Sequence, residues 1–157
     1  MNAAFETLVQ HLDEQDIRYQ ANSEIKSICA DFRGEVGTYR LIASVDDDRD
    51  LFDVYAYSPV RVPEGARPSI AETLTRANYG LRLGKFEMDC DDGEVRFQLA
   101  HVLPDGVLAE EIISRSFSLA MTMLDRYLSA VLSVIYGNEH PKDAIRNVEQ
   151  PEEPEDE

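Results

Sequence analysis

The sequence has few basic residues and few cysteines, and each shortage limits what the protein does. Only 15 residues are lysine or arginine against 31 acidic ones, which gives a net charge of −16. A chain with this charge repels nucleic acid and anionic membrane, so we expect neither as a partner and favour proteins with cationic patches. The two cysteines, Cys29 and Cys90, both fall in predicted strands. Two buried thiols in a reducing cytosol are the favoured interpretation, and a disulfide is the alternative.

A signal sequence and a long uninterrupted hydrophobic run are also missing. The N-terminus has neither the basic region nor the apolar core of a signal peptide. The longest apolar-rich stretch, Phe117–Tyr136, contains Asp125 and Arg126 near its middle, and such charges argue against a membrane span. We therefore expect a cytoplasmic protein with no membrane partner. Its 157 residues are enough for one domain with a genuine core.

Hydrophobic periodicity predicts a series of helices and strands. Apolar spacings of three and four residues indicate helices, and strict alternation indicates strands. The predicted helices cover residues 2–15, 69–79 and 107–136. The predicted strands are Ser27–Arg33, Thr38–Val45, Leu51–Ser58 and the two arms of a hairpin within residues 84–99. The order α-β-β-β-α-β-β-α predicts a single α+β domain over residues 1–137, with helices packed on an antiparallel five-stranded sheet.

The hairpin is the most specific local prediction. Asp92-Gly93 suits a two-residue type I′ turn, because both central positions of that turn need a positive φ. Pairing outward from this turn sets Cys90 against Val95, Met88 against Phe97, Phe86 against Leu99, and Asp89 against Arg96. The first three pairs are apolar and share one face, as a period of two requires.

Two helix starts carry capping signals. Ser69 and Glu72 have the spacing of a capping box, which predicts the start of the second helix. Asp105 suits the N-cap of the third helix, and Glu110 and Glu111 favour the positive end of its dipole.

The third helix has more apolar circumference than a sheet alone covers. One arc consists of Ile113, Phe117, Ala120, Leu124, Leu128, Val131 and Ile135. A second arc consists of Leu108, Ile112, Leu119, Met123, Tyr127 and Val134. A surface helix ordinarily has a single apolar stripe. We therefore single out Leu119, Met123, Tyr127 and Val134 as a dimer seam, a partner-binding surface, or extra core beneath the first helix.

Apolar periodicity stops after Gly137. The chain ends in "VEQPEEPEDE", which has too little apolar surface to offset the entropy cost of ordering it. We therefore expect residues 138–157 to form an acidic, disordered tail.

The acidic clusters suggest a metal site or a catalytic pair, but neither has the required arrangement. The acids of residues 46–50 lack the alternate spacing, central glycine and final glutamate of a calcium loop, so a solvated turn is favoured. The acids of residues 89–94 surround an exposed turn, where no burial separates their pKa values for acid–base work.

The histidines do not form a metal or nucleophile motif either. His11, His101 and His140 fall in separate elements, without a second ligand at metal-binding spacing. A couple of His101 with Cys29 or Cys90 needs both side chains on one sheet face, and ordinary sheet positions are favoured. We therefore expect no catalytic residue, no cofactor and no metal site.

The run "RANYGLRLGKFEMDCDDGEVRFQLAHVL" resembles the YbjN family of bacterial sensory-transduction regulators. The similar features are Asn78 near the end of the short helix, the Gly84-x-Phe86 pattern, and residues 92–96, followed by a long helix. The resemblance extends from about Ser69 to Tyr136. The family is similar in fold to the type III secretion chaperones, which implies a dimeric, non-enzymatic protein-binding module with no catalytic residues to carry over.

The sequence therefore predicts a regulator or chaperone-like protein of the bacterial cytoplasm. It would hold segments of a partner protein against apolar patches on an acidic surface, and it would form a homodimer. The alternatives are a small metal-dependent enzyme that uses surface carboxylates, and a structural subunit of a larger complex.

Overall fold

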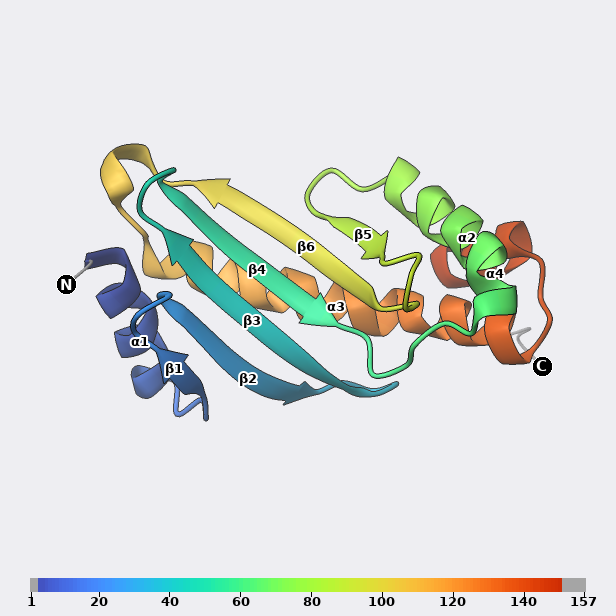
Figure 1. Ribbon diagram of the computed structural model, residues 1–157, viewed down its shortest axis with the longest axis horizontal. Helices are drawn as coiled ribbons and strands as arrows, with labels where there is room; N and C mark the ends of the chain where they lie inside the picture. The colour runs from blue at the N-terminus through green and yellow to red at the C-terminus, as the bar shows by residue number, and fades with distance from the viewer. Residues whose placement is uncertain (1–2, 151–157) are drawn as a thin grey trace, which may run out of the picture.

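The computed structural model describes residues 3–150 and shows one antiparallel sheet with helices on a single face (Figure 1). The helices are α1 (Ala3–Glu14), α2 (Arg67–Tyr79), α3 (Glu110–Tyr136) and α4 (Pro141–Glu149). The strands are β1 (Gln20–Asn22), β2 (Ser27–Arg33), β3 (Thr38–Asp46), β4 (Leu51–Tyr57), β5 (Lys85–Met88) and β6 (Val95–Val102). Short 3-10 turns at Glu64–Ala66 and Pro104–Gly106 precede α2 and α3.

The six strands lie in the order β1-β2-β3-β4-β6-β5, and every neighbouring pair is antiparallel. Alternate residues of each central strand are buried, which puts one apolar face of the sheet under the helices. The buried side chains of the three central strands are Tyr39, Leu41, Ala43, Val45, Phe52, Val54, Ala56, Val95, Phe97 and Leu99. The sheet class and this inward face agree with the sequence prediction.

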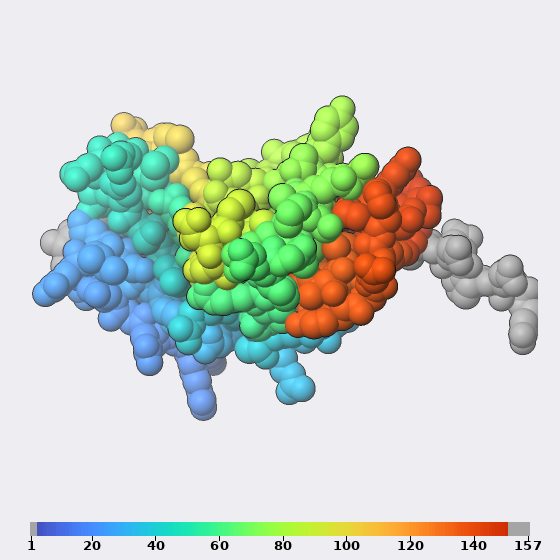
Figure 2. Space-filling model, turned by 45° about the vertical axis from the view of Figure 1, so that its right-hand side comes forward, coloured from blue at the N-terminus to red at the C-terminus, as the bar shows by residue number. Residues whose placement is uncertain are grey.

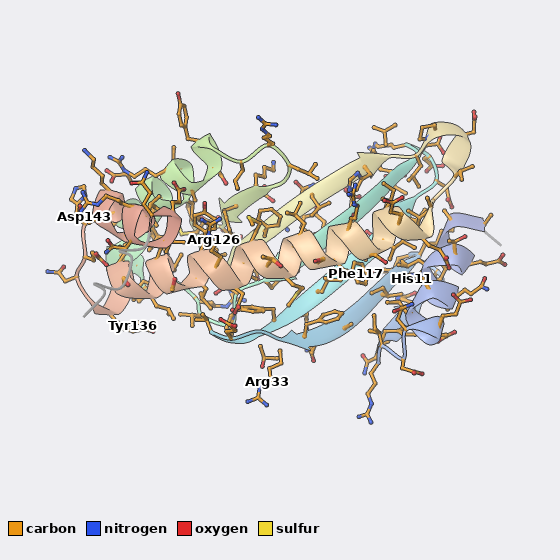
Figure 3. All side chains as sticks on the ribbon, turned by 180° about the vertical axis from the view of Figure 1, so that it is seen from behind. His11, Arg33, Phe117, Arg126, Tyr136 and Asp143 are labelled. Carbon is orange, nitrogen blue, oxygen red and sulfur yellow. The ribbon has the colours of Figure 1, made fainter. Side chains whose placement is uncertain are left out.

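The helix α3 crosses the inner face of the sheet and forms the centre of the core (Figure 3). Its residues Ile113, Ala120 and Leu124 are almost completely buried against the strands. The helix α1 packs beside the N-terminal half of α3, and α2 and α4 pack beside its C-terminal half. Within residues 3–150 no helix covers the outer face of the sheet.

The sheet has one strand more than predicted, because β1 gives no hydrophobic signal. All three residues of β1 are exposed, and the strand pairs with the start of β2 through Gln20 and Cys29. A short edge strand without a buried face shows no alternation of apolar and polar residues.

The predicted register of the β5–β6 hairpin is wrong by two residues. Phe86 lies opposite Phe97, Glu87 opposite Arg96, and Met88 opposite Val95. Gly93 has the predicted positive φ of 79°, but Asp92 is not among the described residues with positive φ, so the turn is not type I′. The hairpin closes instead around residues 90–93, with Gly93 N–H donating to the Asp89 carbonyl at 2.7 Å. A shift of two keeps the same side chains on the inner face, so the apolar pattern does not reveal it.

Both predicted helix caps are also wrong. The helix α2 begins at Arg67, directly after the 3-10 turn, so Ser69 lies inside it and Glu72 pairs with Arg76 at 3.1 Å. The helix α3 begins at Glu110 rather than near residue 107, and Asp105 lies in the preceding turn with φ of 56°. In each case a tight turn leads into the helix and displaces its start from the capping signal.

The predicted tail is wrong for the residues that form α4. His140 caps this helix by accepting a hydrogen bond from the Lys142 N–H at 3.2 Å, and Ala144 and Ile145 are buried. The helix packs against both α3 and α2. Nine residues with three buried ones, Pro141, Ala144 and Ile145, are therefore enough to order a segment whose acidic ending predicted disorder. Residues 151–157 lie outside the described part of the chain.

Asp125 joins the middle of α3 to the β2–β3 turn. Its carboxylate accepts hydrogen bonds from the N–H groups of Glu35 and Val36, at 3.0 and 2.9 Å, and from the Tyr39 hydroxyl at 2.5 Å. Burial by itself would raise the pKa of Asp125, but the hydrogen bonds from Tyr39, Val36 and Glu35 outweigh it and lower that pKa. Burial and the same bond to Asp125 raise the pKa of Tyr39. This charge inside the apolar-rich stretch therefore has a structural role.

We expect Asp125→Asn to lower the free energy of unfolding at pH 7 by about 1–2 kcal/mol, because the amide accepts charge-assisted bonds less well. The pKa of Asp125 is lower in the folded protein than in the unfolded chain. Its contribution is therefore complete above an unfolded-state pKa of about 4 and is lost as the pH falls through the folded-state value. Urea unfolding from pH 7 to pH 3 measures this difference.

The matched control is Thr122→Ala, an exposed change one turn earlier in α3 that should alter stability by less than about 0.5 kcal/mol. A gap between Asp125→Asn and the unsubstituted protein that stays constant over this pH range would contradict the assigned role.

We expect Ile145→Ala to lower the free energy of unfolding by about 2 kcal/mol, since it removes a buried side chain and leaves a cavity between α4, α3 and α2. The exposed change Lys142→Ala in the same helix is the control. Equal midpoints of urea unfolding for the two variants would show that α4 adds no stability to the domain.

Candidate protein-binding surface

The second apolar arc of α3 divides into a covered half and an open half. Tyr127 and Val134 are buried, with 4% and 7% of their surface exposed. The Tyr127 ring packs edge-on against Phe86 with centroids 5.3 Å apart, and its hydroxyl donates to Glu149 of α4 at 2.9 Å. Burial, together with this bond to the Glu149 carboxylate, raises the pKa of Tyr127 to about 12. These two residues are core, but they are covered by α4 and not by the first helix, which is where the sequence analysis placed the core interpretation.

The helix α4 is the element that covers this half of the arc. It lies against α2 on the molecular surface (Figure 2). Arg126 reaches along it and donates to the Val148 carbonyl at 3.5 Å, and its guanidinium lies 5.5 Å from the Tyr127 ring centroid. A partner therefore cannot reach Tyr127 or Val134 while α4 is in place.

The open half of the arc lines a groove between α3 and the β6 side of the sheet. This α3 groove has a volume of about 500 Å³ and is lined by Leu83, His101, Ile112, Arg115, Ser116, Ser118, Leu119 and Thr122. Ile112 and Leu119 are half-buried, and Leu83 is 46% exposed. Met123, one turn beyond Leu119, is also half-buried. Of the four residues singled out from the sequence, Leu119 and Met123 thus stay accessible, and Leu119 lines the groove.

The sequence did not indicate Leu83 as a site residue. It lies in the short link between α2 and β5, and the only local signal is an apolar side chain between two glycines, Gly80 and Gly84. Its proximity to Ile112 and Leu119 depends on tertiary packing, which neither helical nor strand periodicity describes.

A larger hollow of about 910 Å³ lies on the opposite flank of α3, next to the β2–β3 turn. Its lining includes Phe32, Val36, Met121 and Asp125. The Asp125 carboxylate already accepts three hydrogen bonds there, and Phe32 packs edge-on against Phe117 at 6.1 Å. The Asp125 carboxylate is therefore already bound by the fold itself and is not free for a ligand in this hollow.

The acids of residues 46–50 serve the β3–β4 turn. Asp46 accepts from the N–H groups of Asp48 and Arg49, both at 3.1 Å, and pairs with the Arg49 guanidinium. The backbone bond from Arg49, followed by the bond from its side chain, lowers the pKa of Asp46. Asp47 pairs with Lys26. This arrangement agrees with the solvated turn favoured by the sequence.

The acids of residues 89–94 likewise stabilise the hairpin loop. Asp92 and Glu94 pair with Arg61 at 2.6 and 3.4 Å, and Asp89 accepts from the Asp91 N–H at 2.8 Å. The Glu94 N–H, followed by Arg61, lowers the pKa of Asp92, which is the opposite of what a general acid at neutral pH needs.

The cysteines and His101 do not come together. Cys29 is half-buried on the outer face of β2, and Cys90 is exposed in the hairpin loop, so neither is the buried strand thiol that the sequence predicted. His101 points to the inner face, where its Nε2 lies 3.0 Å from the Ser116 Oγ. Both thiols are free, and no nucleophile–base couple forms. Within residues 3–150 there is also no group of three metal-ligating side chains.

One described helix, α3, is long and apolar enough to cross a membrane by length and composition. The core helix of a soluble protein can have the same length and composition, and α3 packs on the sheet along the face that holds Ile113 and Leu124.

Comparison with solved structures identifies the fold. The crystal structure of YbjN from E. coli, described as "a putative transcription regulator", has 15% sequence identity and a TM-score of 0.58, over 80% of this chain and 88% of that one. A chain of the ExsC–ExsE complex has 12% identity and a TM-score of 0.54, over 80% of this chain and 96% of that one. No curated protein matches the sequence.

Comparison with protein families gives the stronger result. The profile of YbjN, described as "Putative bacterial sensory transduction regulator", matches residues 4–133, so α4 lies beyond the matched region. The family and the chaperone-like fold predicted from the sequence are confirmed. Since the match covers most of the sequence, this chain belongs to the YbjN family.

Proposed function

We propose that this protein is a non-enzymatic regulator or chaperone-like module that holds a segment of a partner protein in the α3 groove. The main support for this proposal is the groove itself, in which Leu83, Ile112 and Leu119 expose apolar surface to solvent. Concave apolar surface beside a few polar groups is a typical binding site. The proposed location is the bacterial cytoplasm.

The similarity to a chain of the ExsC–ExsE complex supports a protein partner, because that fold occurs there in an assembly of two proteins. The functional groups of the described residues support a binding role over catalysis. In the two acidic clusters, arginine or lysine pairs with Asp46, Asp47, Asp92 and Glu94, and Asp89 accepts a bond from its own turn. The net charge of −16 favours cationic partners and speeds their encounter.

We expect Leu119→Asp to abolish capture of the partner, because a carboxylate on the groove wall must be desolvated when an apolar side chain enters. Tagged unsubstituted protein and the variant would be recovered from the native host, and the bound proteins would be compared by quantitative mass spectrometry. The matched control is Tyr79→Asp, which introduces the same charge on a side chain 96% exposed and outside the groove. Identical sets of bound proteins for Leu119→Asp and the unsubstituted chain would contradict this proposal.

The homodimer stays a prediction, and its seam excludes Tyr127 and Val134 while α4 covers them. We expect light scattering at tens of micromolar, a range typical for specific assembly, to give twice the chain mass of 17.7 kDa. Met123→Asp locates the seam: a lower mass places it on the accessible part of the α3 arc, and an unchanged mass places it elsewhere. A mass of 17.7 kDa for the unsubstituted chain would show that the prediction is wrong.

A further inference from the structure

The strand β6 has an unpaired edge next to the α3 groove. In the β4–β6 ladder the odd-numbered residues of β6 bond to β4, as the Ser58 N–H to Val95 carbonyl bond of 2.9 Å shows. The even-numbered residues therefore direct their N–H and C=O groups toward β5. The strand β5 pairs only with residues 95–98, so the backbone groups of Ala100 and Val102 face outward. None of the hydrogen bonds between described residues involves these groups.

Gly84 lies where β5 stops pairing with β6, and so it accounts for the unpaired edge at Ala100 and Val102. It has a φ of 78°, and a side chain at this position would collide with the Phe97 ring. The chain bends away from β6 at this residue instead of continuing along it, and it carries Leu83 to the rim of the groove. The open edge and the apolar groove thus arise from the same bend.

The edge of β5 and the unpaired end of β2 are protected. The outward N–H and C=O of Phe86 in β5 are both bonded by the Asn78 side chain, at 2.7 and 3.0 Å. The unpaired end of β2 carries Asp31 and Arg33, and charged side chains discourage strand pairing. Ala100 and Val102 are both exposed and uncharged, and Val102 is 73% exposed. Among residues 3–150, the outermost strand β1 also has a free edge, but it is only three residues long, whereas the β6 edge combines free backbone groups and uncharged side chains with an adjacent apolar groove.

A carboxylate beside this edge specifies the charge of the occupant. Asp53 of β4 lies opposite Ala100 on the outer face. No ion pair or hydrogen bond among residues 3–150 uses its side chain. A strand added to β6 would lie about 10 Å from β4, which a long basic side chain and Asp53 together span across the small Ala100. The inward side chain of such a strand would enter the α3 groove.

We propose that the β6 edge at residues 100–102 binds an extended partner segment as a seventh strand, with a basic–apolar–basic pattern. The two basic residues would lie opposite Ala100 and Val102 on the outer face, and the apolar residue between them would contact Leu83, Ile112 and Leu119. This inference rests on the proposed function and specifies how the groove is used. A second copy is disfavoured as the occupant of this edge, because two paired β6 edges would bring no lysine or arginine at residues 100–102 to Asp53.

The experiment selects binders from a phage-displayed library of random octapeptides on the full chain and measures the most enriched peptide by fluorescence anisotropy. We expect an alternating basic–apolar–basic consensus. Ala100→Pro should weaken binding by at least about tenfold, because proline removes an outward N–H and its ring occupies the edge. Methylation of the peptide nitrogens at the two basic positions should have a similar effect, since it removes the matching donors.

Two further variants keep the test decisive if Ala100→Pro unfolds. Val102→Lys should weaken binding because it places a charge on the edge and repels the basic segment. Asp53→Asn should reduce affinity by about twofold to fivefold, as expected for one cross-strand charge pair. The matched control is Asp31→Pro, which removes an outward N–H from the unpaired part of β2 and should leave affinity unchanged.

The outcomes separate this inference from the proposed function. Peptides that lose affinity on Leu119→Asp but bind Ala100→Pro, Val102→Lys and the unsubstituted chain equally would retain the groove and overturn strand addition. Enrichment of no peptide would count against both. A dimer that dissociates on Ala100→Pro would show that a second copy occupies the edge, which would also overturn the proposal.

Discussion

The structure depends on covering one apolar sheet face with helices that are narrower than the sheet. Six strands about 4.8 Å apart make a sheet about 24 Å wide, whereas one helix with its side chains is about 10 Å across. The helix α3 therefore covers only a central band. At its N-terminal end α1 fills the β1–β2 flank, where His11 bonds Ser114 at 3.2 Å, and at its C-terminal end α2 and α4 fill the β5 flank. Among residues 3–150, no further helix lies on the flank between β6 and the N-terminal half of α3, and the α3 groove is found there.

The sequence predicted the elements that have a buried face and missed those that do not. The strand β2 has the predicted bounds, and β3 and β4 differ from prediction by one residue each, because alternate burial enforces alternate polarity. The strand β1 has no buried residue, so its pairing left no trace in the pattern. The helix α4 has few apolar residues and follows a break at Gly137, and its order comes from α3 and α2 rather than from its own composition. Local sequence patterns do not reveal packing between segments that are far apart in the chain.

Only part of the candidate site could be predicted from the sequence, again because periodicity reports burial of a face and not which segment covers it. The excess apolar circumference of α3 was correctly recognised as a surface that needs a cover, and for Tyr127 and Val134 the cover is the chain's own α4. Periodicity around one helix shows that an arc must be covered, but it does not tell which element covers it. Leu119 remains accessible because α4 and α2 are confined to the C-terminal half of α3. Its neighbour Leu83 comes from a link without periodicity, so only the folded chain shows that the two residues share a groove.

The residues that carry the family resemblance act together in the structure. Asn78 closes the outer edge of β5 by bonding both backbone groups of Phe86, and the Phe86 ring then packs against Phe97 and Tyr127 in the core. Gly84 makes the bend that allows β5 to begin at Lys85 and no earlier. A longer β5 would pair with Ala100 and Val102, cover the free edge of β6, and move Leu83 away from the groove. The short, firmly closed β5 is thus the feature that keeps the rest of β6 open, because an edge strand that ends early leaves its neighbour's backbone groups in need of a partner.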